Sequence, residues 1–333
     1  MRNKIISVLL VSVLLLAGCN FSKPVGATTD EGDNEINKIS LDNEVIQSEV
    51  EEEAEPEPYE FNPHVHTDLM SEVVTEEMWG AFYNLCDALR AGEDTFECPS
   101  EEAYEWCTDS GTMGVFLPAS CEMAEGDGYA DGVGRIKYLT EKEAFLEREK
   151  NFEEEIVRMV NAAVKSNYSD FEKVMGMYAY VCKYWQYDYS DIDGCSIDEF
   201  GTYACLMTKK GICCEVAYAY SYLLLQVGVE AMPFGASCNH DWTYVQIDGI
   251  GYHVDATWGL HGDNPDGPLT LQYFMMTEKD RLNDGFEKES LEASIIWPIK
   301  RDYDLARFSA NDARFKPLET MRLLEKWILK EMS

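Results

Sequence analysis

The stretch KKGICCEVAYAYSYLLL, from Lys209 to Leu225, decides the fold. A glycine and two adjacent cysteines, Cys213 and Cys214, precede a run that is apolar on nearly every face. This run predicts a buried helix that begins at the cysteines and ends at Gly228. A thiol at a helix N-terminus lies at the positive end of the helix dipole, which favours the thiolate. The pattern therefore predicts a reactive cysteine.

A reactive thiol needs a histidine as its proton acceptor, and the chain has five histidines. His64 and His66 precede the predicted domain, and His261 lies in a loop rich in Gly, Asp and Pro. His240 and His253 remain. We expect His240 to be the base and His253, in the middle of a strand, to have a structural role, although its position in the sequence also permits the role of base.

A hairpin connects His240 to an acidic residue. The strand-like segments DWTYVQI and GYHVDATW are separated by Asp248-Gly249, a signal for a two-residue turn. In that register Trp242 pairs with Asp255, and His240 is a diagonal neighbour of Asp255 on the same face. A three-residue loop would place the two side chains on opposite faces. The sequence therefore predicts a contact between His240 and Asp255.

Three motifs share this part of the chain. They are Gly211-Ile212-Cys213, His240-Asp241-Trp242 and Val254-Asp255-Ala256-Thr257-Trp258. In order and spacing they resemble the G-x-C, H-x-W and V-D-x-T-W motifs of the transglutaminase-like superfamily. The resemblance extends over residues 178–276.

The resemblance implies an α+β, papain-like fold, in which a nucleophile helix packs against an antiparallel sheet. It also implies a catalytic triad of Cys213, His240 and Asp255. Cys213 would attack a carboxamide or peptide carbonyl, His240 would carry the proton, and Asp255 would set the imidazole tautomer. Water or an amine would then resolve the thioester. The resemblance implies no cofactor.

Two details near the nucleophile go beyond the motifs. Successive helical residues are turned by about 100°, so Cys213 and Cys214 cannot both face one histidine. The G-x-C motif selects Cys213, and we expect Cys214 to point into the core. The Cys213 N–H is one expected oxyanion donor. Trp185 and Tyr187 are candidates for a second donor, with ordinary packing as the favoured alternative, and Trp242 is a candidate for substrate contact.

The N-terminus has the pattern of an export signal. Arg2 and Lys4 precede an apolar run over residues 5–16, which is too short for a membrane-spanning helix. The run ends in Leu-Ala-Gly before Cys19, which resembles a bacterial lipoprotein signal. We therefore expect lipidation at Cys19 and a protein anchored to the cell membrane on its extracytoplasmic side. An ordinary secretory signal is the alternative.

Charge and composition narrow the partners. The chain has 333 residues and a formal net charge of −35, which argues against binding to nucleic acid. Residues 30–60 contain thirteen acidic residues and one lysine, which predicts a disordered spacer. No C-x-x-C pair is present, so a metal site is not expected. An exported chain permits disulfides, and Cys86, Cys98, Cys107 and Cys121 allow two bridges in three pairings.

The predicted organisation has five parts. A signal peptide (1–19) is followed by an acidic spacer (20–69) and a mainly helical region (70–170). A transglutaminase-like core (171–290) and an extension with a terminal helix (291–333) complete the chain. Within the helical region, RIKYLT predicts a strand and GDGYADGVG a loop.

The predicted function is that of a surface-tethered cysteine hydrolase or acyltransferase, of protease or amidase type. Its substrate would be a peptide, protein or cell-wall amide. A non-catalytic binding module at the cell surface is the alternative, and the intact triad argues against it. A calcium-dependent cross-linker of the animal type is disfavoured, because nothing resembles the additional β-domains of those enzymes.

Overall fold

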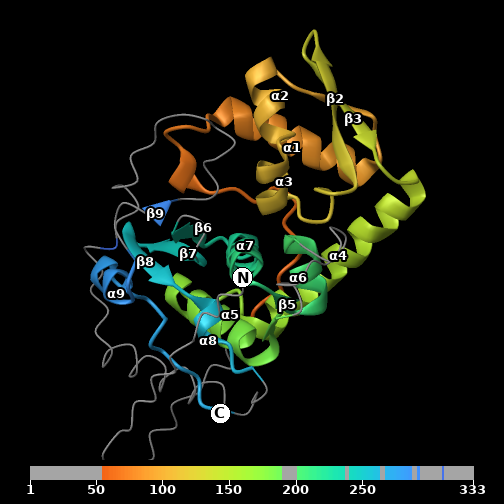
Figure 1. The fold of residues 1–333 in the computed structure, drawn as a ribbon. Coiled ribbons are helices and arrows are strands. Elements are labelled where there is room, and N and C mark those ends of the chain that lie inside the picture. The colour runs from red at the N-terminus through yellow and green to blue at the C-terminus, as the bar shows by residue number, and fades with distance from the viewer. Residues whose placement is uncertain are drawn as a thin grey trace, which may run out of the picture. The chain divides into compact units, whose positions relative to one another are not determined.

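The computed structural model describes residues 55–189, 201–236, 240–262, 267–286, 291–292 and 310. The predicted signal peptide, most of the predicted spacer and the predicted terminal helix lie outside these ranges. The described residues form a mixed helix and sheet structure, shown in Figure 1. Within them, no helix has both the length and the apolar character needed to cross a membrane.

The first part of the domain has three helices with side-chain caps at their N-termini. Thr75, Ser100 and Asp109 each accept a backbone N–H with the side chain at a helix start. Gly92 ends the first helix with φ of 69°, a left-handed conformation that suits glycine. The helices are α1 (Glu76–Ala91), α2 (Glu101–Cys107) and α3 (Ser110–Phe116).

A small antiparallel sheet accompanies these helices, in the order β1-β3-β2. The strand expected over RIKYLT is present, but the loop expected over GDGYADGVG is wrong, because most of it belongs to strands. Asp131 and Gly132 form the turn, with φ of 51° and 84°. Both positive values are typical of a type I′ hairpin turn. Several glycines in the segment concealed its strand character. The strands are β1 (Thr95–Glu97), β2 (Ala124–Ala130) and β3 (Val133–Tyr138).

Two longer helices lead from this sheet into the core. Helix α4 (Lys142–Ala163) begins after Glu141. Helix α5 (Asp170–Tyr184) begins with a capping box formed by Ser169 and Glu172. A Cβ atom on Gly176 would lie 2.6 Å from the Ala163 carbonyl oxygen, so glycine permits α5 to cross closely over the end of α4.

The helix predicted to begin at the paired cysteines is α7 (Cys213–Gln226), and it is followed by Gly228 with φ of 75° as predicted. It packs against β6 and β7 of the main sheet and against α5. Two short parallel strands, β4 (Gln186–Tyr187) and β5 (Lys210–Gly211), bring the end of α5 beside the start of α7. Helix α6 (Thr202–Thr208) precedes β5.

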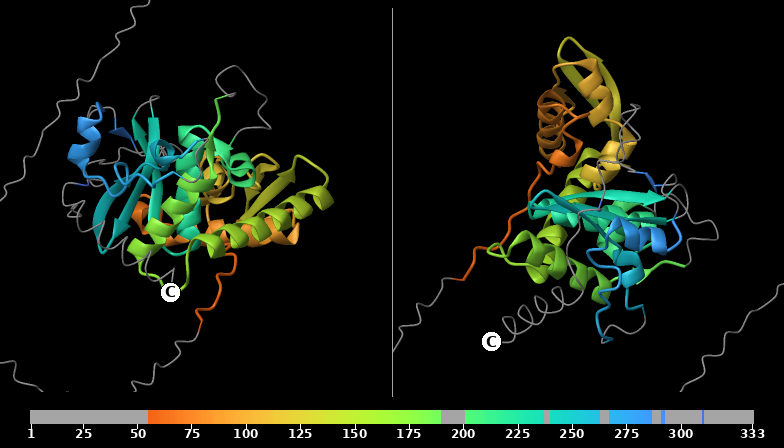
Figure 2. Two further views of the ribbon diagram at one scale, coloured as in Figure 1. Left: turned by 90° about the horizontal axis from the view of Figure 1, so that it is seen from below. Right: turned by 90° about the vertical axis from the view of Figure 1, so that its left-hand side faces the viewer.

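The main sheet is antiparallel, with the order β8-β7-β6-β9. Its strands are drawn in teal and blue in Figure 2, where β6, β7 and β8 run side by side. Short helices flank the sheet. The elements are β6 (Glu230–Ala236), β7 (His240–Ile247), β8 (Ile250–Val254), β9 (Leu291–Glu292), α8 (Ala256–Gly259), α9 (Glu278–Asn283) and the 3₁₀-helix η1 (Asp68–Met70).

The β7–β8 hairpin has the predicted two-residue turn. Asp248 and Gly249 both have positive φ, and Ile247 pairs with Ile250. The ladder ends one residue earlier than expected, at Thr243 and Val254. The chain bends away at Asp255, where the side chain caps α8 by accepting the Trp258 N–H. The register prediction is confirmed, although Trp242 and Asp255 are not a ladder pair.

The last part of the predicted spacer contacts the domain. Val65 and Thr67 are buried, and Tyr59 and Asn62 hydrogen-bond Asn161 and Gln226. These contacts fix residues 59–69 against the domain. The buried residues of the helical region and of the main sheet belong to one hydrophobic core, so the two predicted regions do not have separate cores.

The eight cysteines within the described residues are free thiols. They include all four for which the sequence allowed two bridges, so neither bridge is present. The other three cysteines, Cys19, Cys195 and Cys238, lie outside the described ranges.

Candidate active site

The start of α7 explains why glycine and glutamate flank the paired cysteines. A Cβ atom on Gly211 would lie 2.7 Å from the Cys205 Sγ and 3.0 Å from the Glu215 Oε2. Glu215 Oε2 accepts the Ile212 N–H at 2.9 Å, and Oε1 accepts the Gly201 N–H at 2.6 Å. A carboxylate in the first helical turn also complements the helix dipole. Glu215 therefore supports the helix start, and Gly211 leaves the space for it.

Cys213 is the first residue of α7 and is half-buried. Burial raises the pKa of its thiol. The hydrogen bond with His240, the Asp241 backbone N–H and the charge of His240 lower it by more, so the pKa lies below its ordinary value. The thiol is thus favoured as thiolate when the imidazole is protonated.

His240 is the first residue of β7 and contacts Asp255 directly. The His240 Nε2 and the Asp255 Oδ2 are 2.7 Å apart, and both side chains are buried. Burial lowers the pKa of His240. The hydrogen bonds and charges of Asp255 and Cys213 outweigh this effect and raise it to about 9. Because Nε2 is engaged by Asp255, Nδ1 is the ring nitrogen that remains for Cys213.

The three residues predicted to act together are therefore brought together. Cys213 interacts with His240 from the helix, and Asp255 interacts with His240 from the end of β8. A raised imidazole pKa beside a lowered thiol pKa favours a thiolate–imidazolium pair at neutral pH. This arrangement has the chemistry of an activated sulfur nucleophile.

Cys214 does not point into the core as expected. Its side chain is half-buried and lines a cavity of about 260 Å³ with Gly111 and Gly114 of α3 and Tyr218 of α7. The expectation failed because it considered only α7, whereas the way α3 packs on α7 determines what Cys214 faces. Burial raises the pKa of the Cys214 thiol to about 12.

The aromatic candidates for substrate contact lie in different environments. Trp242 has 1% of its surface exposed and donates its Nε1–H to the His253 Nδ1 at 3.0 Å, so that N–H is not available to a substrate. Trp185 is also 1% exposed, and its Nε1 has no hydrogen-bond partner within the described residues. Tyr187 is only half-buried. Of the three, Tyr187 alone is open to solvent.

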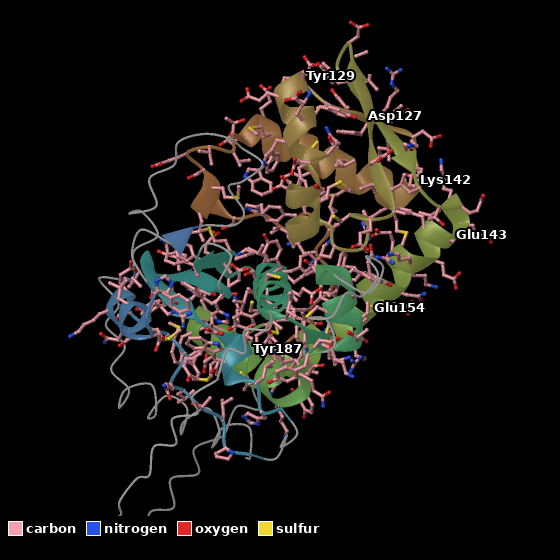
Figure 3. All side chains as sticks on the ribbon, viewed as in Figure 1. Asp127, Tyr129, Lys142, Glu143, Glu154 and Tyr187 are labelled. Carbon is pink, nitrogen blue, oxygen red and sulfur yellow. The ribbon has the colours of Figure 1, made fainter. Side chains whose placement is uncertain are left out.

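A cavity of about 680 Å³ adjoins His240. Aromatic rings line much of it. Among its described lining residues, His240 is the one histidine, and none is Lys, Arg, Asp or Glu. Figure 3 labels Tyr187 in the lower half of the molecule, far from Asp127 and Tyr129 on the β2–β3 hairpin. The lining consists of Gln186, Tyr187, Tyr189, His240, Thr257, Trp258, Leu260 and Gly262.

Two charged residues of α9, Glu278 and Arg281, contact His253 and Asp255. The sequence did not predict these contacts. The His253 Nε2 is 3.0 Å from the Glu278 Oε2, and its Nδ1 accepts from Trp242. Arg281 Nη1 is 3.2 Å from the Asp255 Oδ2. Glu278 and Arg281 belong to α9, which follows a loop whose path no local pattern predicts. The structural role expected for His253 agrees with its complete burial.

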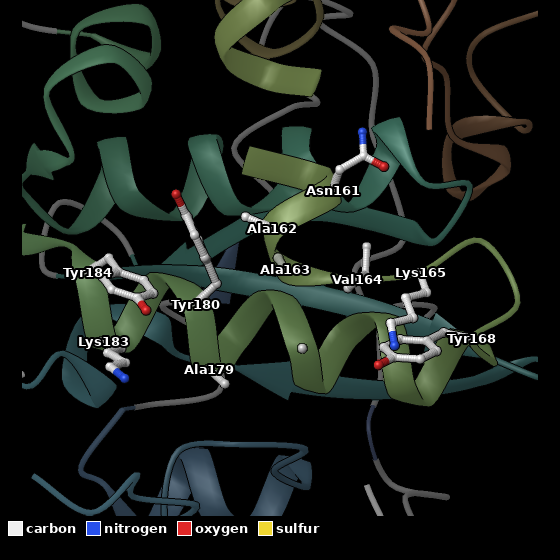
Figure 4. A pocket seen from close by; sticks show the side chains of 11 residues that line it. Asn161, Ala162, Ala163, Val164, Lys165, Tyr168, Ala179, Tyr180, Lys183 and Tyr184 are labelled. Atoms are coloured by element: carbon white, nitrogen blue, oxygen red, sulfur yellow. The ribbon is translucent and has the colours of Figure 1, made fainter. Parts of the chain in front are cut away.

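Another groove, of about 320 Å³, lies between the end of α4 and α5 (Figure 4). Lys183 and Tyr184 lie near one end of it, and Lys165 and Tyr168 near the other. It contains no thiol or imidazole among its lining residues and shares none of them with the cavity beside His240. Within the described residues, no group of three His, Cys, Asp or Glu side chains is arranged to hold a metal ion.

Comparisons with known proteins found resemblance only at the level of structure. No family model matches the sequence, and the search of curated proteins found no match. A solved structure described as a TGase matches with 13% identity and a TM-score of 0.30, over 53% of each chain. A Cytophaga hutchinsonii protein described as "a Putative Cysteine Protease" matches with 14% identity and a TM-score of 0.22, over 40% of this chain and 61% of the other.

The matched parts span less than two thirds of either neighbour. At these scores the likeness supports no statement about activity. The chemistry of the site is therefore argued from Cys213, His240 and Asp255 themselves.

Proposed function

We propose that this chain is a cysteine hydrolase or acyltransferase of the transglutaminase-like type, acting on peptide or carboxamide bonds. The observation that supports it most is the 2.7 Å contact between the His240 Nε2 and the Asp255 Oδ2, with Cys213 on the other side of the ring. Thiol, imidazole and carboxylate in this order are the parts of a nucleophilic triad.

In the proposed reaction, the resting site holds a Cys213 thiolate and a protonated His240. The sulfur attacks the substrate carbonyl carbon, which becomes tetrahedral and carries the negative charge on its oxygen. When the intermediate collapses, the carbon–nitrogen bond breaks and the Nδ1–H proton passes to the leaving amine. A thioester to Cys213 and a neutral imidazole remain.

The second half returns the site to its resting state. Neutral His240 takes a proton at Nδ1 from water or from an amine, which attacks the thioester. The carbon–sulfur bond breaks, releasing a carboxylic acid or a new amide and restoring the thiolate. Asp255 accepts the Nε2–H throughout, which keeps Nδ1 free for proton transfer.

The surroundings of His240 bear on the choice of substrate. The adjoining cavity presents Tyr187, Tyr189 and Trp258, whose rings are partly or largely exposed. The chain itself is strongly acidic, with a net charge of −35. Exposed aromatic faces and an acidic field favour a peptide or cell-wall amide whose bound part is not anionic.

We further propose that the protein is tethered through a lipid on Cys19, as its N-terminal pattern indicates. Two acyl chains on one cysteine suffice for stable membrane attachment. Cys19→Ala should leave the signal uncleaved or move the protein from the membrane fraction to the soluble fraction. Unchanged fractionation together with an unchanged mature mass would contradict the tether.

The test of the activity is selective alkylation of Cys213. Iodoacetamide at low concentration and neutral pH should modify Cys213 faster than it modifies any thiol of the denatured chain. His240→Ala should remove this advantage. If Cys213 reacts no faster than a denatured thiol, the chain is a binding module with this fold and not an enzyme.

A further inference from the structure

Arg281 of α9 is fully buried behind the candidate triad. Its guanidinium carbon lies 3.9 Å from the ring centre of Trp242, 5.0 Å from that of Trp258 and 4.7 Å from that of Phe286. The same three rings contact the His240 imidazole. One aromatic cage therefore holds both the proposed base and a permanent positive charge.

The polar contacts of Arg281 are directed at two carboxylates. Its Nη1 lies 3.2 Å from the Asp255 Oδ2 and 3.2 Å from the Asp284 Oδ2. The Asp255 Oδ2 is the same atom that contacts the His240 Nε2, and the Asp255 Oδ1 accepts the Trp258 N–H at 2.9 Å. Asp255 thus has a cation on one side, an imidazole on the other and a backbone donor to its second oxygen.

Stability alone does not account for a buried arginine at this position. Burying a guanidinium has a large desolvation cost, and an apolar side chain of similar size often stabilises a core equally well or better. The Nε and Nη2 of Arg281 have no hydrogen-bond partner within the described residues, so the desolvation is only partly offset. Of its two carboxylate contacts, the one to Asp255 connects Arg281 to the His240 ring.

We infer that Arg281 is a positioning residue for the proposed reaction, which keeps the Asp255 carboxylate aligned with His240 and moderates its negative field at the imidazole. The inference rests on the proposed function. Arg281 acts through Asp255. It is therefore distinct from the three residues that take part in the chemistry.

The charges around Arg281 set the expected directions. Asp255 precedes α8. Asp280 belongs to α9, and Asp284 is the residue that follows its last turn. Tyr273 and the pair of His253 and Glu278 are the other titratable groups that face it. Removing the positive charge of Arg281 leaves the field of Asp255 at His240 undiminished, which raises the pKa of His240. Removing the charge of Asp284 leaves Arg281 less neutralised, which lowers it.

The experiment uses the full chain with Arg281→Met, Arg281→Lys and Asp284→Asn. Two quantities are measured: the pKa of the His240 ring by NMR without substrate, and the alkaline limit of kcat/KM on a peptide amide. Arg281→Met should raise both by about one pH unit and reduce kcat/KM roughly 10- to 100-fold, mainly through kcat. Arg281→Lys should restore the alkaline limit, and Asp284→Asn should shift it downward.

Arg158→Met provides a matched control, because Arg158 is exposed and pairs with Glu155 on the surface of α4. It should leave both quantities unchanged. Asp284 is exposed, so Asp284→Asn still tests the inference if Arg281→Met does not fold. The pKa of His240 should rise in Arg281→Met and fall in Asp284→Asn. A general loss of stability does not explain shifts of opposite sign.

The two proposals fail in different ways. Turnover with unchanged pH limits in Arg281→Met and Asp284→Asn would overturn the role of Arg281 and leave the proposed function intact. A wild-type chain with ordinary Cys213 reactivity would overturn the proposed function. The NMR shifts of His240 would then still report whether Arg281 acts on the ring through Asp255.

Discussion

Two histidines on the β7–β8 hairpin have similar partners and opposite properties. His240 contacts Asp255 at 2.7 Å, and His253 contacts Glu278 at 3.0 Å. Yet the pKa of His240 is raised to about 9, whereas that of His253 is lowered. A carboxylate neighbour alone therefore does not make a histidine a base.

The difference lies in burial and in the second ring nitrogen. His253 is completely buried, and desolvation is the largest cause of its lowered pKa. Its Nδ1 accepts the Trp242 indole N–H, so both nitrogens are engaged by the core. His240 is at the start of its strand, and its Nδ1 remains for Cys213. The His240 imidazole can therefore transfer a proton. The His253 imidazole instead connects Trp242 of β7 with Glu278 of α9.

The largest effect should come from replacing the two histidines in turn. His240→Gln should lower kcat/KM on a peptide amide by roughly 10⁴-fold or more, because no other group takes the proton from sulfur. His253→Gln should retain kcat/KM within about tenfold for the folded fraction. The measurement is kcat/KM corrected for the folded fraction of each variant, determined by circular dichroism. Equal losses in both variants would remove the functional distinction between the rings.

The next effect tests the carboxylates. Asp255→Asn should lower kcat by roughly 10³- to 10⁴-fold, because an amide does not hold the proton of His240 on Nε2. Glu278→Gln keeps a hydrogen-bonding oxygen near His253 and should leave kcat nearly unchanged. Steady-state kinetics of the two variants decide the matter. A strong loss in Glu278→Gln would mean that His253 takes part in the chemistry.

A pH titration should separate the rings directly. The pKa of His240 is about 9, so its ring should stay protonated through neutral pH in an NMR titration, while His253 stays neutral. Because His253 has a folded pKa below its ordinary 6.5, the unfolded chain binds more protons between these two values. The contribution of His253 to stability is thus present above pH 6.5 and is lost as the pH falls.

Urea unfolding at pH 5 and pH 7.5 measures that loss. His253→Gln should be less stable than the wild type at pH 7.5, by about 1–3 kcal/mol, because Trp242 and Glu278 lose a buried partner. The deficit should shrink at pH 5. A deficit that grows on acidification would reverse the assignment.

The smallest expected effects on stability concern the paired cysteines. Cys213→Ala should abolish turnover and change the unfolding midpoint little, since a half-buried thiol contributes little packing. Cys214→Ala should retain turnover and cost less than about 1 kcal/mol, because its side chain borders an existing cavity. Activity and thermal midpoint are measured for both. An active Cys213→Ala beside an inactive Cys214→Ala would transfer the nucleophile to Cys214.

Local sequence patterns were sufficient to predict the features that depend on residues close together in the sequence. The Asp248-Gly249 turn determines the register of the hairpin, and with it the shared face of His240 and Asp255. The apolar run after Cys213 and the final Gly228 predicted α7 and its end. These features depend on backbone sterics and on the alternation of side chains along a strand, which a few consecutive residues encode.

Other features depended on segments that are distant in sequence. Cys214 faces a cavity because α3 packs on α7, a contact between residues about a hundred positions apart. The contact between His253 and Glu278 and the approach of Arg281 to Asp255 require α9 to return to the hairpin. Periodicity and turn signals report only on local conformation, whereas these contacts arise when the whole core closes. The sequence by itself therefore determined the helix that begins at Cys213 and the hairpin, and the tertiary structure decided what surrounds them.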